Sequence, residues 1–213
     1  MTKRTLIDTL ILSSILVGSA CAAFAQQKPA RAADGHLMHE RPPLFLKEAW
    51  KQPATPGEHP VSQEAVSSPS LELKLYGGSA KEILVSGDSA NPGNPLNLWT
   101  GVTTTPIAVT LRDKQNFVDL TDLGKIRWVT RTSGFHVVRP VVKLADGTWL
   151  VGDAASGTWA DFNESEKGGW VQKPDLSKVD EIGSADLIPG SGHGAGGWVN
   201  VGQVEVYGKP MKR

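Results

Sequence analysis

Hydrophobic and polar positions alternate in short runs from residue 71 onward, and turn residues separate the runs. A period of two is expected where one face of a β-strand is buried and the other is solvated. The pattern predicts strands at 71–76, 81–85, 96–100, 107–112, 125–132, 136–144, 149–152, 179–185 and 201–207. Residues 44–50 are compatible with either an amphipathic turn or a first strand.

The clearest of these predictions is a hairpin. Val142 and Leu144 fall on one face of their run, and Arg139 and Lys143 fall on the other. Asp146-Gly147 then supplies residue types that accept the positive φ of a tight turn, so the chain reverses into the next run. After the N-terminal leader, no stretch holds a helical period longer than about three turns. The sequence therefore predicts an all-β fold, an antiparallel β-sandwich in which two half-apolar sheets cover each other.

The N-terminus has a different pattern. Lys3 and Arg4 form a basic start, and residues 10–17 are apolar apart from two serines. This stretch is shorter than the roughly 20 apolar residues that span a bilayer. Ala23-Phe24-Ala25 follows with the small-x-small pattern that a signal peptidase accepts. The sequence predicts a signal peptide at 1–25, cleaved after Ala25, and hence a secreted or periplasmic protein.

Two alternatives to this cleavage are lipoprotein processing at Cys21 and a retained membrane anchor. Lipoprotein processing usually requires a large aliphatic residue three positions before the cysteine, where this chain has Gly18. A retained anchor conflicts with the short apolar stretch. Cleavage after Ala25 is therefore preferred.

Cleavage after Ala25 also limits the chemistry. It removes Cys21, the single cysteine, and leaves 188 of the 213 residues. Such a chain has no disulfide, thiolate nucleophile or cysteine-bound metal, so it depends on a core that buries about 70% of the unfolded surface. Lys3, Arg4 and Asp8 leave with the leader, so 22 basic and 22 acidic residues become 20 and 21. We expect no nucleic-acid partner and no integral membrane span after cleavage.

Residues 26–43 are polar and lack an apolar period, which predicts a disordered lead-in to a sandwich domain at 44–213. His36 and His39 have the i, i+3 spacing of a metal-binding pair on a helix. Pro42-Pro43 and the missing periodicity oppose a helix there, so we expect these histidines to be solvated.

Residues 117–121 lead into 125–128, and 175–183 and 204–208 form a terminal pair of segments. These segments resemble the strand signatures of galactose-binding-like jelly-roll domains. In that family a strand near the end is followed by a last strand that completes the sandwich. The resemblance implies a jelly-roll β-sandwich similar to carbohydrate-binding modules.

The chain also resembles a set of uncharacterised exported bacterial proteins through phrases such as Lys143-Leu-Ala-Asp-Gly-Thr-Trp-Leu-Val151. This likeness covers roughly residues 44–213, and its motifs are structural rather than chemical. Between Glu166 and Trp170 the chain is shorter than such proteins, which puts a ligand site near that segment in doubt.

Tryptophan is the residue type that most favours a ligand site. The chain has seven tryptophans and only two tyrosines, and five of the tryptophans lie beside turns or loops. These five are Trp99, Trp149, Trp159, Trp170 and Trp198. An exposed indole stacks on a sugar ring while polar side chains bind its hydroxyls. The alternative is that these rings pack the core, as we expect for Trp128, which shares a face with Ile126.

A second group comprises His136 and Arg139, with Asp153 at the far end of the hairpin. Positions three apart on a strand lie on opposite faces, so His136 and Arg139 require a bulge to join one cluster. An arginine on a strand is usually solvated or ion-paired, yet Arg131 and Arg139 each have the reach to bind a sugar hydroxyl or a carboxylate.

The loop at 188–198 holds five glycines around His193. It lacks the following Lys-Ser/Thr and the helix of a phosphate-binding loop. We expect either a binding lip formed by His193 beside Trp198 or a plain mobile loop.

Asp161, Glu164 and Glu166 are the candidate acid and base of a glycosidase. Nothing apolar lies nearby to raise a pKa, so a solvated acidic loop is preferred, or a calcium site using Asp161. No other cofactor is expected. Neither Gly-x-Ser-x-Gly nor His-Glu-x-x-His occurs.

Together these features predict an exported noncatalytic module that binds a glycan. The expected ligand-binding residues are Trp149, Trp198, His193, Arg139, Trp99 and His136. One alternative is an exported hydrolase or lyase on the same scaffold, which predicts two carboxylates converging in a tryptophan-lined cleft. Another is an envelope structural or assembly protein, which predicts a broad apolar face.

Overall fold

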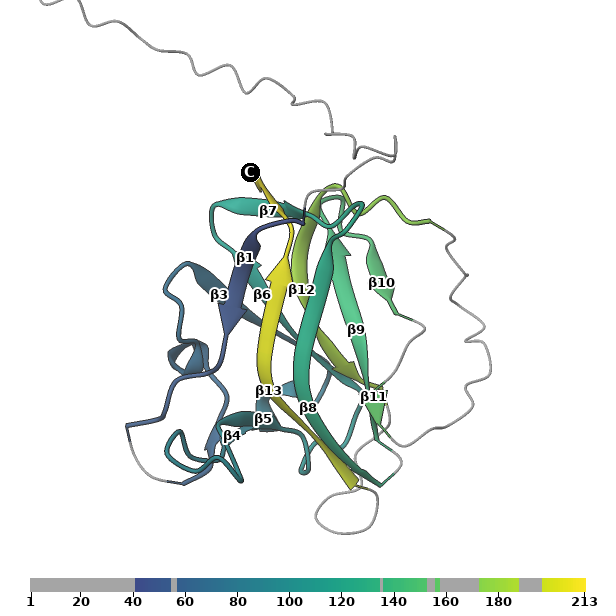
Figure 1. Ribbon diagram of the computed structural model, residues 1–213. Helices are drawn as coiled ribbons and strands as arrows, with labels where there is room; N and C mark the ends of the chain where they lie inside the picture. The colour runs from purple at the N-terminus through teal and green to yellow at the C-terminus, as the bar shows by residue number, and fades with distance from the viewer. Residues whose placement is uncertain (1–40, 55–56, 135, 153–155, 158–172, 188–196) are drawn as a thin grey trace, which may run out of the picture. The chain divides into compact units, whose positions relative to one another are not determined.

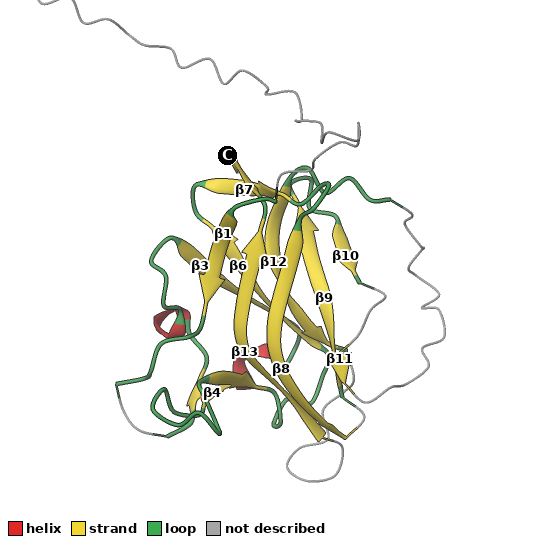
Figure 2. Cartoon of the chain, in the orientation of Figure 1, coloured by secondary structure: helices red, strands yellow, loops and turns green. Residues whose placement is uncertain are grey.

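The computed structural model describes residues 41–54, 57–134, 136–152, 156–157, 173–187 and 197–213. Within these ranges the chain forms fourteen strands and two short 3-10 turns, η1 (Gln63–Ala65) and η2 (Ala80–Glu82). The strands make two antiparallel sheets (Figures 1 and 2). None of the helical segments described has the length and apolar character needed to cross a membrane. The predictions for 1–40, Asp153, Trp159, Asp161, Glu164, Glu166, Trp170 and His193 lie outside the described residues.

The first sheet has six strands in the order β1-β13-β5-β4-β2, and β8 also pairs with β13. Its strands are β1 (Leu44–Glu48), β2 (His59–Pro60), β4 (Leu84–Ser86), β5 (Asn97–Trp99), β8 (Lys125–Gly134) and β13 (Gly197–Tyr207). The long pair β8 and β13 shifts register between Val201 and Gln203, which marks a β-bulge in β13.

The second sheet has eight strands, five of them in the order β10-β9-β12-β6-β3. In addition, β11 pairs with β9, and β7 pairs with β12 and β14. Its strands are β3 (Leu71–Tyr76), β6 (Ile107–Asp113), β7 (Asn116–Asp119), β9 (Val137–Leu144), β10 (Trp149–Val151), β11 (Ser156–Gly157), β12 (Val179–Asp186) and β14 (Lys209–Lys212).

A single hydrophobic core joins the two sheets. Leu98, Val199 and Val206 reach it from the six-stranded sheet, and Val109 and Ile182 reach it from the eight-stranded sheet. Burying these apolar faces supplies the main driving force for folding. The predicted antiparallel β-sandwich is confirmed. Trp128 is half-buried and packs against this core, as expected from its position.

The predicted strands are present with two notable differences in extent. The run 81–85 begins as the 3-10 turn η2, because Ala80 is buried and the Ser79 hydroxyl accepts backbone hydrogen bonds from Thr104 and Thr105. Strand β13 begins at Gly197 rather than at residue 201. Of the two options for residues 44–50, the strand is the one observed.

The hairpin between β9 and β10 has the predicted turn. Gly147 takes a φ of 92°, and the Asp146 carboxylate accepts a hydrogen bond of 2.9 Å from the Thr148 N–H. Trp149 then pairs with Lys143 across the two strands. The turn therefore fixes which residue lies opposite Trp149.

A buried carboxylate anchors the first strand. Glu48 has no exposed surface, and its Oε1 accepts hydrogen bonds from the N–H groups of Trp50 (2.7 Å) and Ser67 (2.9 Å). Its Oε2 accepts a third from the Ser68 N–H. The Trp50 indole N–H donates to the Val201 carbonyl at 2.8 Å. Glu48 thus ties β1 to the segment after η1, and Trp50 ties it to β13.

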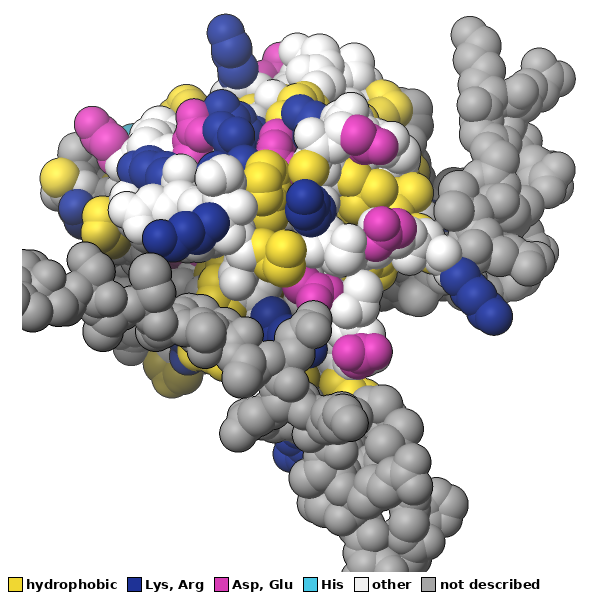
Figure 3. All heavy atoms as spheres, turned by 90° about the horizontal axis from the view of Figure 1, so that it is seen from above, with side chains coloured by type: hydrophobic (Ala, Val, Ile, Leu, Met, Phe, Trp, Pro, Cys, Tyr) yellow, Lys and Arg dark blue, Asp and Glu magenta, His cyan; other side chains and the backbone are white. Residues whose placement is uncertain are grey.

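The end of the sandwich that lies uppermost in Figure 1 is chemically mixed. Figure 3 shows hydrophobic side chains between basic and acidic ones on this face.

Candidate functional site

The structure distributes the sequence-predicted ligand residues over three places. Trp149 lies on the outer face of the eight-stranded sheet, because its neighbour Leu150 packs against the core. Trp99 and Trp198 lie on the outer face of the six-stranded sheet, and His136 lies in the interior.

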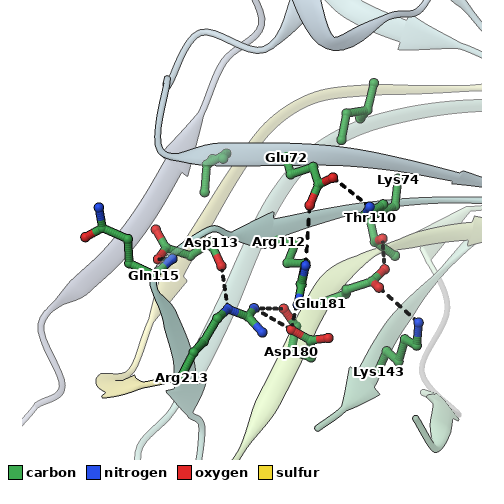
Figure 4. A network of polar contacts seen from close by, with 12 residues as sticks. Glu72, Lys74, Thr110, Arg112, Asp113, Gln115, Lys143, Asp180, Glu181 and Arg213 are labelled. Carbon is green, nitrogen blue, oxygen red and sulfur yellow. Dashed lines mark hydrogen bonds and ion pairs between the residues drawn. The ribbon is translucent and has the colours of Figure 1, made fainter.

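The richest polar arrangement surrounds Glu181 on the outer face of the eight-stranded sheet. We define the Glu181 cluster as Tyr76, Thr110, Lys143, Trp149 and Glu181. These residues come from five strands, β3, β6, β9, β10 and β12, and Figure 4 shows the polar contacts of this face. Strand alternation explains their common face, because the residues between them point into the core.

A β-bulge contributes to this arrangement. The pairing of β12 with β9 shifts register between Val179 and Glu181, so Asp180 is the extra residue. Asp180 and Glu181 consequently both carry side chains to the outer face, as Figure 4 shows. A regular strand would have turned one of them inward.

Glu181 is the centre of the cluster although it is only 2% exposed. Its carboxylate accepts hydrogen bonds from the Tyr76 hydroxyl at 2.8 and 2.9 Å and from the Thr110 hydroxyl at 2.5 Å. Lys143 Nζ donates to it at 3.1 Å and supplies the opposite charge. A buried carboxylate is stable only when it is paired and hydrogen-bonded, and these three donors meet that need.

The aromatic part of the cluster lies beside this ion pair. The rings of Tyr76 and Trp149 meet edge to face, with centroids 4.7 Å apart. Lys143 Nζ lies 5.7 Å from the Tyr76 centroid and 5.5 Å from the Trp149 centroid. Trp149 is nevertheless 38% exposed. The cluster therefore holds an indole in place while leaving part of it accessible.

Charged residues beside the cluster are paired with one another. Glu72 contacts Lys74 at 2.7 Å and Arg112 at 3.5 Å. Asp180 contacts Arg112 at 3.0 Å and also pairs with Arg213. This face therefore offers polar groups without a strong excess of either charge.

Hydrogen bonding and burial set the protonation of the cluster. Burial, together with the neighbouring Glu181 carboxylate, raises the pKa of the Tyr76 hydroxyl. The hydrogen bond to Glu181 raises the pKa of the Lys143 ammonium group. Tyr76 is therefore neutral and Lys143 charged at neutral pH, and neither is poised to act as a base.

His136 belongs to a different, interior arrangement. It is 1% exposed, and its Nδ1 lies 2.6 Å from Oδ2 of Asp186, which is 2% exposed. Thr100 donates its hydroxyl to the same Asp186 oxygen at 3.1 Å and accepts a hydrogen bond from the Val199 N–H. Nε2 of His136 has no hydrogen-bond partner among the described residues. This group links β5, β12 and β13 inside the sandwich.

Arg139 lies on the same face of β9 as Lys143, four residues away. It is half-buried, and its Nη1 donates to the Gly152 carbonyl at 3.1 Å. His136 and Arg139 therefore do not form one site. In the described part of the chain no group of three or more His, Cys, Asp or Glu side chains is arranged to hold a metal.

Sequence reasoning missed Tyr76, Thr110, Lys143 and Glu181 as members of a site. Part of the signal was available, because Glu72, Lys74 and Tyr76 alternate with the leucines of β3 and so share one face. The pairing of five strands, which brings Tyr76 to Glu181 across 105 positions, is not visible in any local pattern. Comparison with protein-family models, curated proteins and solved structures gives no match for this chain.

Proposed function

We propose that this protein is an exported, noncatalytic carbohydrate-binding module of the galactose-binding-like jelly-roll class, with its glycan site at Trp149. The observation that carries the proposal is the half-exposed indole of Trp149, fixed against Tyr76 and Lys143. Such an indole stacks on the apolar face of a sugar ring with little loss of conformational entropy, because its position is already set.

Polar groups on the same face of the sheet complete the proposed site. Glu72, Lys74 and Arg112 each keep about a third of their side-chain surface exposed while paired with one another. Groups of this kind exchange hydrogen bonds with sugar hydroxyls, which serve as both donors and acceptors. Because the charges largely cancel, a neutral glycan suits this face better than an acidic one.

Export is the second part of the proposal. The basic start, the short apolar stretch and the Ala23-Phe24-Ala25 pattern support a leader cleaved after Ala25. The protein would then meet its glycan in the periplasm or outside the cell.

A single preparation tests both parts. The full-length chain is produced in a bacterial host, and the N-terminus of the extracytoplasmic protein is determined by mass spectrometry. We expect it to begin at Gln26. The recovered protein is then screened against neutral polysaccharides such as galactan, xylan and laminarin, with release of reducing ends measured in parallel. Saturable binding without cleavage supports the proposal. No binding to any of these, or cleavage of one of them, contradicts it.

A further inference from the structure

The outer face of the six-stranded sheet carries a second aromatic group. Val199 and Val201 point into the core, so Trp198 and Asn200, which alternate with them along β13, point outward. By the same alternation Leu98 is internal, and Trp99 is directed outward. Two of the tryptophans singled out in the sequence therefore share this face.

Strand pairing brings these residues together. Asn200 is the direct partner of Trp99 on β5 and of Arg131 on β8. Trp198 lies in the next outward row of β13, diagonal to Trp99, where side chains are still within reach of each other. The Arg131 guanidinium lies 5.3 Å from the centroid of the Trp198 ring, and Asn200 donates a hydrogen bond to Asn97. The result is a row of stacking and hydrogen-bonding groups across three strands.

This face has an excess of positive charge on β1, β8 and β13. Lys125, Arg127 and Arg131 are exposed on one face of β8, with the exposed Val129 between the two arginines, and Lys47 is exposed on β1. Glu205 is the one acidic side chain that these strands direct outward, and it contacts both Arg127 (3.1 Å) and Lys47 (3.5 Å). Four cations against one carboxylate contrast with the balanced charge around Trp149.

Lys125, Arg127 and Arg131 form a basic row along β8, and the length of this row limits which ligands can contact all of it. Lys125 and Arg131 are six residues apart on an extended strand, which corresponds to about 20 Å. A single sugar is too short to contact both ends of such a row. An extended chain with repeating negative charges can contact all of it.

We infer that Trp99, Arg131, Trp198 and Asn200 form a second binding site, for an acidic polysaccharide such as a polyuronate. The inference rests on the proposed function in taking a glycan as the ligand, and it adds a different chemical class on the opposite sheet. The indoles stack on the sugar rings, and Arg131 pairs with a uronate carboxylate in the bidentate geometry that guanidinium favours. The module would then hold two different glycans at once, one on each outer face.

The test measures binding of the exported protein to polygalacturonate, with neutral dextran as the uncharged reference. We expect saturable binding to polygalacturonate that weakens as salt is raised. Arg131→Gln should weaken it by about tenfold, which corresponds to roughly 1.4 kcal/mol. The matched control is Lys209→Gln, because this lysine is 60% exposed on β14, in the other sheet. The control removes the same charge elsewhere and should change binding by less than about twofold.

Two further variants separate this site from the one at Trp149. Trp198→Phe keeps an aromatic ring and tests stacking without removing charge, and it should weaken polygalacturonate binding by a few-fold. Trp149→Ala should leave polygalacturonate binding unchanged. A result against the proposed site at Trp149 can then be told apart from a result against the proposed site at Arg131. The inference is overturned if Arg131→Gln and Lys209→Gln have equal effects. Equally tight binding to duplex DNA or to anionic phosphatidylglycerol vesicles would also overturn it, because charge alone would then explain retention.

Discussion

The ring of Trp149 on β10 meets the ring of Tyr76 on β3 edge to face, with centroids 4.7 Å apart and planes at 82°. These strands lie at opposite ends of the path β10-β9-β12-β6-β3. Four steps of about 4.8 Å would separate them by roughly 19 Å in a flat sheet. The sheet must therefore curl, and both side chains must lean over the strands between them.

The Tyr76 hydroxyl is expected to contribute to stability through Glu181. Tyr76→Phe keeps the ring and removes the donor that lies 2.8 Å from the buried carboxylate. We expect a loss of about 1.5 to 3 kcal/mol in the free energy of unfolding, the usual contribution of a hydrogen bond to a charged group. Urea denaturation measures it. An unchanged midpoint would show that Glu181 does not depend on Tyr76.

Lys143 is expected to contribute more to stability than Tyr76, because its positive charge neutralises the Glu181 carboxylate. Lys143→Met keeps a long apolar side chain but leaves the 2% exposed carboxylate without its cation. We expect a loss of about 3 kcal/mol. The double variant Lys143→Met, Glu181→Gln should recover part of that loss, because no uncompensated charge is then buried. Strictly additive effects of the two changes would contradict the coupling.

Asp180 is expected to make stability depend on pH. Burial raises the pKa of its carboxyl, but hydrogen bonds from Arg112 and Arg213 and their charges outweigh burial and hold that pKa below its ordinary value of 3.8. Stability from such a group is present above the pKa of the unfolded chain and is lost as the pH falls through the lower pKa of the folded protein. Asp180→Asn should therefore be less stable than the parent at about pH 7, and the difference should shrink below about pH 4.

Urea denaturation across this pH range gives the comparison. Asp122→Asn is the control, because its carboxylate is 61% exposed and lies 3.9 Å from Lys209. It should have little effect at any pH. A constant difference between Asp180→Asn and the parent at all pH values would refute the linkage.

The alternation of hydrophobic and polar residues was sufficient to predict the sandwich and its principal hairpin. Edge elements were harder to predict. Strand β14 has the sequence Lys-Pro-Met-Lys, and β2 has only two residues, so neither shows a period of two. The Glu181 cluster depends on the pairing of five strands and on the extra residue at Asp180. A shift of one position would turn every side chain of β12 to the other face, so no local pattern specifies this site.

Glu48 illustrates a structural role that composition does not reveal. Its carboxylate satisfies backbone N–H groups of Trp50, Ser67 and Ser68 in a fully buried position. We expect Glu48→Ala to lower the free energy of unfolding by about 3 kcal/mol, because those donors lose their acceptor. Glu48→Gln keeps one acceptor oxygen and should cost less. Thermal melts of the two variants compare them, and equal losses would contradict this role.

The proposal that Trp149 is the glycan site is tested most directly by calorimetric titration with the tightest-binding neutral polysaccharide of the screen. Trp149→Ala is compared with Val151→Ala, which changes another exposed apolar side chain on the same face of β10. We expect Trp149→Ala to weaken binding by at least about tenfold, corresponding to roughly 1.4 kcal/mol. Val151→Ala should leave the affinity within about twofold of the parent. If Trp149→Ala binds as tightly as the parent while remaining folded, the glycan site does not lie at Trp149.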